Sequence, residues 1–311
     1  MSGKILVTDT LFIFDEHVKK LEEAGYEVER LPKPNATERE LIQAVKGKVG
    51  YILGGIEKVT QKVIEAADNL EAIVFTGIGY KGFIPGWEYA TKKNIVISNV
   101  PDGPTQSVAE WSVTAALVMN RGIFELASPN GETFLTTNGL EGQTIGIIAL
   151  GRIGGRIAEM VQPFHPAATL YYSTHRHEDK ENSLGLEYKE IDELLHKSDV
   201  VFLCVPDEVG HGFFTAKHFA SMKEDALLVS FMHSDIIDVD ALYDALDNGK
   251  IRAISDYPMD DRFNKFPLSK WYSFKASNAF NTKQSLKFTS DRATQALINL
   301  LTTGKDENRV N

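Results

Sequence analysis

The sequence has a single cysteine among its 311 residues, so no disulfide can form within the chain. That residue, Cys204, lies in the apolar run at 200–205, which predicts a buried and unreactive thiol. No apolar run approaches the roughly 20 residues that a membrane-spanning helix needs. Polar residues at 8–10 also interrupt the first apolar stretch before a secretory signal could form. We therefore expect a cytoplasmic protein that does not enter a membrane.

Positive charge is scarce as well. Lys and Arg total 33 against 43 for Asp and Glu, which gives a formal net charge of −10. An acidic chain is poorly suited to a phosphate backbone, so we expect no nucleic acid partner, although a local basic pocket could still bind one small anion. Hydrophobic residues at 43% and charged residues at 24% are typical of a globular protein, and the length suits two domains.

Short apolar runs alternate with stretches of helical periodicity through most of the chain. This alternation is typical of βαβ units, in which helices cover both faces of a parallel sheet. One series covers residues 5–97 and a second covers 144–274, so we predict an α/β protein with two doubly wound parallel-sheet domains. Residues 106–120 predict a long connecting helix between them. The last apolar-periodic segment, 293–301, is expected to return to the first domain.

A turn that contains glycine follows the predicted strand at 144–150. It leads directly into an amphipathic helix that ends near residue 161. A sharp strand-to-helix turn presents backbone N–H groups and the positive helix end to a pyrophosphate. The dinucleotide pattern requires glycine at 149, 151 and 154, and Ala149 departs from it with a methyl group that could crowd the turn. Plain packing glycines are the alternative to a cofactor site. The predicted phosphate-binding residues are Gly151, Arg152, Ile153 and Gly154.

The residues after the next predicted strand, at 170–172, bear on the choice of cofactor. An NAD site normally has an acidic residue there to bind the ribose hydroxyls. This sequence has Ser173, Thr174 and Arg176 instead, which can hydrogen-bond and neutralise a 2′-phosphate. NADP is therefore favoured over NAD, with solvated turn residues as the alternative. No metal site is predicted.

Several motifs together resemble the D-isomer-specific 2-hydroxyacid dehydrogenase family, which includes glycerate, glyoxylate, D-lactate and phosphoglycerate enzymes. The resemblance covers almost the whole chain and rests on residues 76–80, 99–101, 107–110, 142–154, 205–206 and 279–282. It implies two Rossmann-like domains: a flavodoxin-like substrate domain from 1–101 and 285–311, and an NAD(P)-binding domain at 102–284. It also implies a small 2-oxo or 2-hydroxy acid as substrate, a site in the cleft, and a homodimer.

The chemistry of this family depends on three side chains, and the resemblance implies that all three are replaced here. In the family, an arginine clamps the substrate carboxylate, a histidine transfers the hydroxyl proton, and a glutamate fixes the protonation of that histidine. The matching positions hold His233, Ser277 and Asp261, respectively. A serine cannot act as a general acid near neutral pH. His233 could replace the arginine as a cation, pair with Asp261 as acid and base, or be an ordinary hydrogen-bonded histidine.

Other family positions keep their expected chemistry. The backbone N–H groups of Ile78 and Gly79 match those that receive the substrate carboxylate, and Asp256 matches the residue that holds the nicotinamide amide. Val205 and Pro206 match a cofactor-binding segment. Two functions stay open: an NAD(P)-dependent oxidoreductase with an altered active site, and a catalytically inactive member that binds NAD(P) as a sensor or regulator. A partner-binding relic without cofactor is a third.

Overall fold

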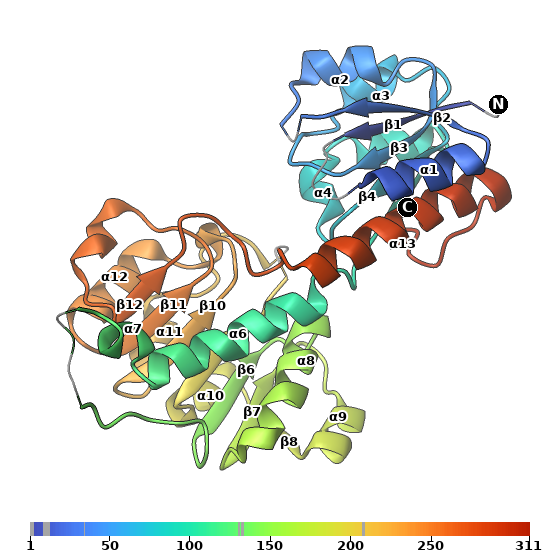
Figure 1. Ribbon diagram of the computed structural model, residues 1–311. Coiled ribbons are helices and arrows are strands. Elements are labelled where there is room, and N and C mark those ends of the chain that lie inside the picture. The colour runs from blue at the N-terminus through green and yellow to red at the C-terminus, as the bar shows by residue number, and fades with distance from the viewer. Residues whose placement is uncertain (1–2, 9–12, 34, 130, 132–133, 207–208) are drawn as a thin grey trace. The chain divides into compact units, whose positions relative to one another are not determined.

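The computed structural model describes residues 3–8, 13–33, 35–129, 131, 134–206 and 209–311 (Figure 1). The chain divides into two units, which are described separately. Unit 1 comprises residues 1–104 and 281–311, and unit 2 comprises residues 105–280. The sequence-based boundaries lie after residues 101 and 284, within a few residues of this division. Residues 102–104 belong to unit 1, where the carbonyl oxygen of Gly103 accepts a hydrogen bond from Ser285 Oγ of the last helix at 2.8 Å.

Unit 1 contains a five-stranded parallel sheet in the order β2-β1-β3-β4-β5, the flavodoxin-like order. Its strands are β1 (Lys4–Thr8), β2 (Glu27–Leu31), β3 (Lys48–Leu53), β4 (Ala72–Phe75) and β5 (Val96–Asn99). Its helices are α1 (Asp15–Glu23), α2 (Glu38–Ala44), α3 (Gln61–Ala66), α4 (Tyr80–Phe83), α5 (Trp87–Lys92) and α13 (Lys283–Thr303). Two buried apolar clusters form its core, and α13 contributes to one of them through Ala293, Ala296 and Leu297. The expected return of the last helix to the first domain is confirmed.

The residues after α13 lie along β5, which is an edge strand of this sheet. The backbone N–H of Val310 donates to the carbonyl oxygen of Ile97 at 2.9 Å, and Arg309 forms an antiparallel bridge with Ser98. The C-terminal segment therefore adds a short antiparallel neighbour to β5.

Unit 2 contains a seven-stranded parallel sheet in the order β12-β11-β10-β9-β6-β7-β8. Its strands are β6 (Thr144–Ile148), β7 (Ala168–Tyr172), β8 (Leu186–Tyr188), β9 (Val200–Leu203), β10 (Ala226–Ser230), β11 (Ile251–Ser255) and β12 (Trp271–Ser273). Its helices are α6 (Thr105–Asn120), α7 (Ile123–Leu126), α8 (Arg152–Val161), α9 (Glu178–Leu184), α10 (Ile191–Lys197), α11 (Ala216–Ser221) and α12 (Val239–Asp247), with 3-10 turns η1 (Gln162–Phe164), η3 (Ser234–Ile236) and η4 (Asp261–Lys265). The order reverses between β6 and β9, as in the Rossmann fold.

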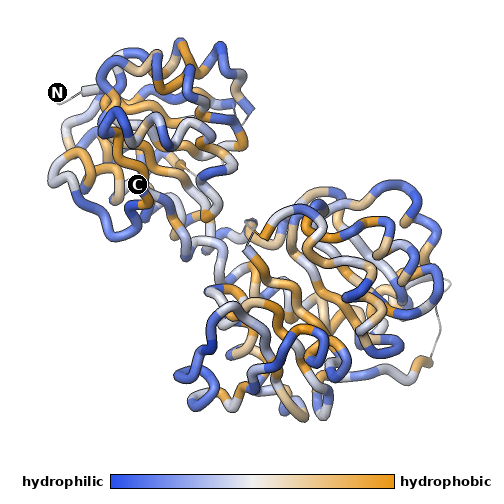
Figure 2. The backbone as a smooth tube through the Cα atoms, turned by 180° about the vertical axis from the view of Figure 1, so that it is seen from behind, coloured by the Kyte–Doolittle hydropathy of each residue, from blue (hydrophilic) through white to orange (hydrophobic). Residues whose placement is uncertain are grey.

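Helices lie on both faces of each sheet (Figure 1). Buried apolar clusters fill both units, and Figure 2 shows the apolar segments of the backbone toward the interior of each unit. Because all strands of unit 2 are parallel, the segments that follow β6, β7, β9, β10 and β11 emerge at one edge, called here the carboxyl edge. Within the described part of the chain, no helix is both long and apolar enough to cross a membrane.

Candidate functional site

The turn between β6 and α8 is the predicted phosphate-binding turn. The helix α8 has ten residues and takes Gly151 as its N-cap, which has no side chain to cap the first N–H groups. A Cβ atom at Gly151 would meet no atom within 4 Å, so the space beside the helix start is open. Uncapped N–H groups at the positive end of a helix favour an anion. The start of α8 therefore has open space at Gly151 beside the positive end of the helix, which suits a phosphate.

Gly154 and Ala149 face each other inside this turn. A Cβ atom at Gly154 would overlap the carbonyl oxygen of Ala149, so glycine is required for the helix to pack against the turn. Ala149 itself has a φ of +73°, a left-handed conformation that costs a non-glycine residue roughly 1–2 kcal/mol. Its N–H donates to the carbonyl oxygen of Tyr172 at 2.7 Å, which helps hold this conformation. The departure from glycine at 149 thus carries a cost in backbone strain.

Arg176, predicted to meet a 2′-phosphate, is paired with Glu181 of α9. Its Nε donates to Oε1 of Glu181 at 3.0 Å, and its Nη2 donates to Oε2. Glu181 also accepts a hydrogen bond from the Tyr171 hydroxyl at 2.5 Å. The hydrogen bond from Arg176 lowers the pKa of Glu181, so this carboxylate stays ionised and offsets the predicted positive charge. The sequence interpretation missed this partner, although a glutamate one turn into the next helix was a visible signal.

The other residues after β7 lie at the same edge. Ser173 is partly buried, and its Oγ lies 3.5 Å from Nε2 of His177, while Thr174 is exposed. After β9, Val205 is buried and Pro206 is exposed. Cys204 is intermediate in exposure rather than fully buried, yet desolvation still raises the pKa of its thiol, as expected for an unreactive cysteine.

Asp256 follows β11 and is almost completely buried, with 1% of its surface exposed. Its carboxylate accepts hydrogen bonds from the backbone N–H groups of Asn278 and Ala279 at 3.0–3.1 Å. The hydroxyl of Ser277 donates to Oδ2 at 2.6 Å. Asp256 therefore anchors the loop at 277–279, and Ser277 is one of its hydrogen-bond donors. The nicotinamide role expected for Asp256 stays a prediction.

His233 follows β10 and is exposed. Its Nδ1 lies 2.7 Å from Oδ1 of Asp235, two residues along the same loop. Asp261, the expected partner, lies beyond β11 in η4, where its Oδ1 accepts a hydrogen bond from Asn264 at 3.3 Å. No contact joins His233 to Asp261 in the described residues. The proposed pairing of these two side chains is therefore corrected: the carboxylate beside His233 belongs to Asp235, which sequence reasoning overlooked.

In unit 1, Ile78 and Gly79 lie in the loop between β4 and α4. The carbonyl oxygen of Ile78 accepts hydrogen bonds from the Asn99 side chain and from the N–H of Tyr80, both at 2.9 Å. These bonds hold the loop, whereas neither Ile78 nor Gly79 donates its own N–H to a described protein acceptor. The two adjacent N–H groups predicted to receive a carboxylate are thus available.

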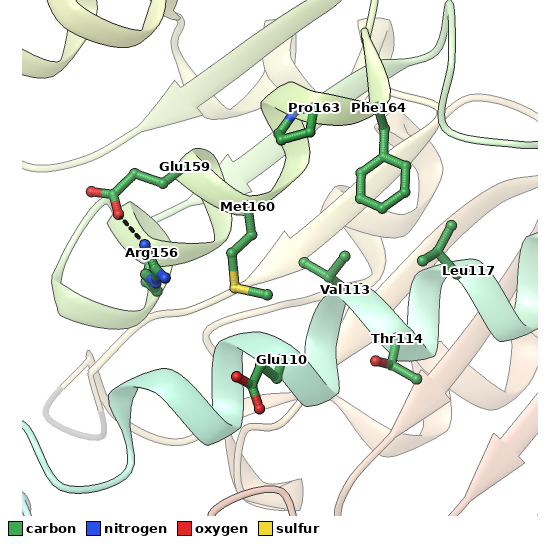
Figure 3. Close-up of a pocket in the computed structure, with 9 residues that line it drawn as sticks. All are labelled: Glu110, Val113, Thr114, Leu117, Arg156, Glu159, Met160, Pro163 and Phe164. Carbon is green, nitrogen blue, oxygen red and sulfur yellow. Dashed lines mark hydrogen bonds and ion pairs between the residues drawn. The ribbon is translucent and has the colours of Figure 1, made fainter.

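A pocket of about 480 Å³ lies between α6 and α8 (Figure 3). Its lining residues are Glu110, Val113, Thr114, Leu117, Arg156, Glu159, Met160, Pro163 and Phe164. They come from α6, from the later part of α8 and from η1, away from the start of α8 at the carboxyl edge. Arg156 is paired with Glu159 at 2.8 Å. None of the residues predicted from sequence lines this pocket, so it is separate from the candidate cofactor site.

Comparison with known proteins tests the family resemblance. Residues 116–274 match the family model described as the NAD binding domain of D-isomer specific 2-hydroxyacid dehydrogenase. The D-3-phosphoglycerate dehydrogenase of Methanocaldococcus jannaschii is 34% identical over 80% of this chain and 48% of its own length, so the match spans about half of that relative. The glyoxylate reductase of Pyrococcus horikoshii is 30% identical over 91% of this chain and 86% of its own length.

The fold is also shared with solved structures. The NAD+-bound 3-phosphoglycerate dehydrogenase of Entamoeba histolytica superposes with a TM-score of 0.83, covering 100% of this chain and 99% of that chain. Its sequence identity is 22%, so this likeness concerns the fold alone. The family model and the two relatives described above provide the evidence for the family. The chain belongs to the D-isomer specific 2-hydroxyacid dehydrogenase family.

Proposed function

We propose that this protein is an NAD(P)-dependent oxidoreductase that interconverts a small 2-oxo acid and the corresponding 2-hydroxy acid at an altered active site. The observation that supports it most is the carboxyl edge of unit 2. There the open turn at Gly151 follows one strand, and the exposed imidazole of His233 follows another strand of the same sheet. A nicotinamide cofactor supplies or accepts the hydride, and His233 is the titratable group of the altered site.

The residues of the β6–α8 turn fit a dinucleotide. The glycine N-cap of α8 and the open space at Gly151 suit the pyrophosphate. In unit 1, the free N–H groups of Ile78 and Gly79 suit the carboxylate of the acid. Backbone donors are thus proposed to supply the carboxylate binding in unit 1.

The direct test is reduction of a panel of 2-oxo acids by NADPH or NADH. We expect cofactor oxidation above a control without protein for at least one acid. Cofactor affinity is measured in parallel by nicotinamide fluorescence. Turnover supports the oxidoreductase, whereas tight cofactor binding without turnover on any acid overturns it in favour of the sensor. If the protein shows neither turnover nor cofactor binding, the result supports a partner-binding relic without cofactor.

The sensor is the second candidate, and a specific observation favours it. Ser277 and Asp261 do not join His233 as a set of catalytic side chains: Ser277 hydrogen-bonds Asp256, and Asp261 hydrogen-bonds Asn264. A protein that only reports cofactor state has no need for such a set. Restoring the family residues with His233→Arg, Asp261→Glu and Ser277→His distinguishes the two. Activity gained only in the triple variant supports a native sensor.

We also propose that NADP is preferred to NAD. Ser173 and Thr174 offer hydroxyl groups, and no acidic residue stands directly after β7 to repel a 2′-phosphate. Arg176 must then exchange part of its pairing with Glu181 for the phosphate. The Glu181→Gln variant removes the competing charge, so we expect its affinity for NADPH to rise several-fold while its affinity for NADH changes little. An equal effect on both cofactors contradicts the preference.

A homodimer is proposed from exposed apolar side chains at and after α7. Ile123, Leu126, Phe134 and Leu135 are all exposed, with Phe134 at 87%. Exposed apolar side chains of this size favour burial against a second copy of the chain. Light scattering during size exclusion should give twice the chain mass, and Phe134→Ser should shift the protein toward monomer. A monomeric wild type at micromolar concentration contradicts the proposal.

A further inference from the structure

Asp235 lies between two imidazole rings in the loop after β10. Its Oδ1 is 2.7 Å from Nδ1 of His233, and its Oδ2 is 3.0 Å from Nδ1 of His211. The His233 ring also lies against Tyr257, which follows β11, with 5.0 Å between ring centres. One carboxylate therefore holds two histidines, one from its own loop and one from the segment after β9.

Two hydrogen bonds from the segment at 212–214 hold the backbone of Asp235 and Ile236. The N–H of Gly212 donates to the carbonyl oxygen of Asp235 at 2.7 Å, and the N–H of Phe214 donates to that of Ile236 at 3.0 Å. Phe214 and Ile236 are buried in the core of unit 2. The Asp235 carboxylate thus extends from a turn whose backbone is hydrogen-bonded and anchored in the core of unit 2.

The contact with Asp235 determines which nitrogen of His233 carries the proton. A carboxylate only accepts hydrogen bonds, so Nδ1 must be the donor, and Nε2 is left to exchange a proton with a ligand. In the described part of the chain no protein group hydrogen-bonds Nε2 of His233. An aspartate at Nδ1 that fixes tautomer and ring orientation is a known means of preparing a histidine for proton transfer.

We propose that Asp235 is a positioning residue that orients His233 as the proton donor to the substrate carbonyl oxygen. This inference rests on the proposed oxidoreductase function. A bound NAD(P)H would supply the hydride that the carbonyl carbon accepts; as the C=O π pair moves to oxygen, the Nε2 proton of the His233 imidazolium would be transferred to that oxygen. The products are the 2-hydroxy acid, NAD(P)+ and neutral His233, which regains a proton from water.

The position of His233 in the sheet supports this role. A dinucleotide on a Rossmann-like sheet lies outside the carboxyl ends of its strands, across the point where the strand order reverses. The phosphates are assigned to the β6–α8 turn, and His233 follows β10 on the other side of the reversal. The family position for the proton donor holds Ser277, whose hydroxyl is engaged with Asp256. His233 therefore takes over a task that Ser277 cannot perform.

The kinetic test uses Asp235→Ala, Asp235→Asn and His233→Gln, with the exposed residues Asp244 and His196 changed to Asn and Gln as matched controls. We expect His233→Gln to lower kcat by roughly 10²–10⁴-fold, the range for loss of a general acid. Asp235→Ala should lower kcat by about 10–100-fold, with KM changed less than threefold and Asp235→Asn intermediate. The controls should match wild type, and circular dichroism verifies that each variant is folded.

A second readout needs no turnover. Long-range ¹⁵N–¹H correlation spectra of the unliganded protein, recorded where the imidazoles are neutral, should show His233 with its proton on Nδ1. In Asp235→Ala this signal should change to a mixture of tautomers, whereas Asp244→Asn should leave it unchanged. The spectra therefore report on orientation independently of activity.

The outcomes separate this inference from the proposed function. If wild type reduces no 2-oxo acid, the proposed function fails and the catalytic role of His233 falls with it. If wild type is active but Asp235→Ala retains its kcat and the tautomer, only the positioning role is overturned. If His211→Gln lowers kcat more than His233→Gln, His233 is not the donor and the inference is wrong.

Discussion

The two halves of the carboxyl edge of unit 2 have diverged to different extents from the family pattern. In the β6–α8 half, Gly151 and Gly154 keep their places, and the single departure, Ala149, is accommodated in a left-handed conformation. In the half that follows β10, β11 and β12, the positions that the resemblance matches to the catalytic residues hold His233, Asp261 and Ser277. Phosphate binding at the turn depends on backbone space and N–H groups, which many sequences can supply. Proton transfer depends on side-chain identity, so a few substitutions alter it completely.

The largest effect is expected from Gly154→Ala, which breaks the half that is retained. The new methyl group would overlap the carbonyl oxygen of Ala149, and the shift this forces outweighs the roughly 1 kcal/mol that alanine gains in a helix. We expect a loss of about 2 kcal/mol in the free energy of unfolding and a cofactor affinity reduced at least 100-fold. Denaturant unfolding and fluorescence titration measure the two effects.

The matched control for this variant is Gly151→Ala. Its Cβ would meet no protein atom, and its φ of −74° suits alanine. Stability should therefore stay within about 0.5 kcal/mol of wild type, while affinity falls if phosphates occupy the open space. Unchanged cofactor affinity in this control would mean that the phosphates do not bind beside Gly151.

A somewhat smaller effect is expected from Asp256→Asn in the altered half. The amide replaces one acceptor oxygen with a donor that faces the N–H groups of Asn278 and Ala279. Leaving such buried groups badly paired should cost about 1.5 kcal/mol in the free energy of unfolding. Ser277→Ala removes only one donor and should cost about 1 kcal/mol. If both variants unfold like wild type, the loop at 277–279 is not held by this carboxylate.

The smallest effect, and the only stabilising one, is expected from Ala149→Gly. Glycine adopts a φ of +73° without the Cβ clash, so the folded state should gain about 1 kcal/mol. The gain should be visible as a rise of a few degrees in the melting temperature. A lower melting temperature would mean that packing of the methyl group outweighs the strain.

The sequence predicts the architecture well because periodicity reports directly on burial. The connecting helix predicted at 106–120 corresponds to α6, and the helix predicted to end near residue 161 corresponds to α8, since each follows a clear turn. The strand β8 at Leu186–Tyr188 escapes prediction because three residues with one buried side chain give no period.

The candidate site is less predictable for a different reason. Glycines in a strand-to-helix turn have a local signature, so the turn between β6 and α8 could be located from spacing alone. The partners of His233 have no such signature. Asp235 lies two residues away but within a 3-10 turn, and His211 reaches the same carboxylate from the segment after another strand. Contacts between loops at a sheet edge depend on tertiary packing, which no periodic pattern records.

The C-terminal segment on β5 has a consequence for solubility. A bare edge strand presents a row of unpaired N–H and C=O groups that can template pairing with another molecule. Val310, Arg309 and the Asn311 amide, which donates to the carbonyl oxygen of Ile95 at 2.9 Å, occupy part of that row. Residues 309–311 thus cover part of this edge strand and reduce its ability to pair with the edge of another molecule. Shortening the chain by a few residues should leave the core of unit 1 intact and still make the protein prone to self-association.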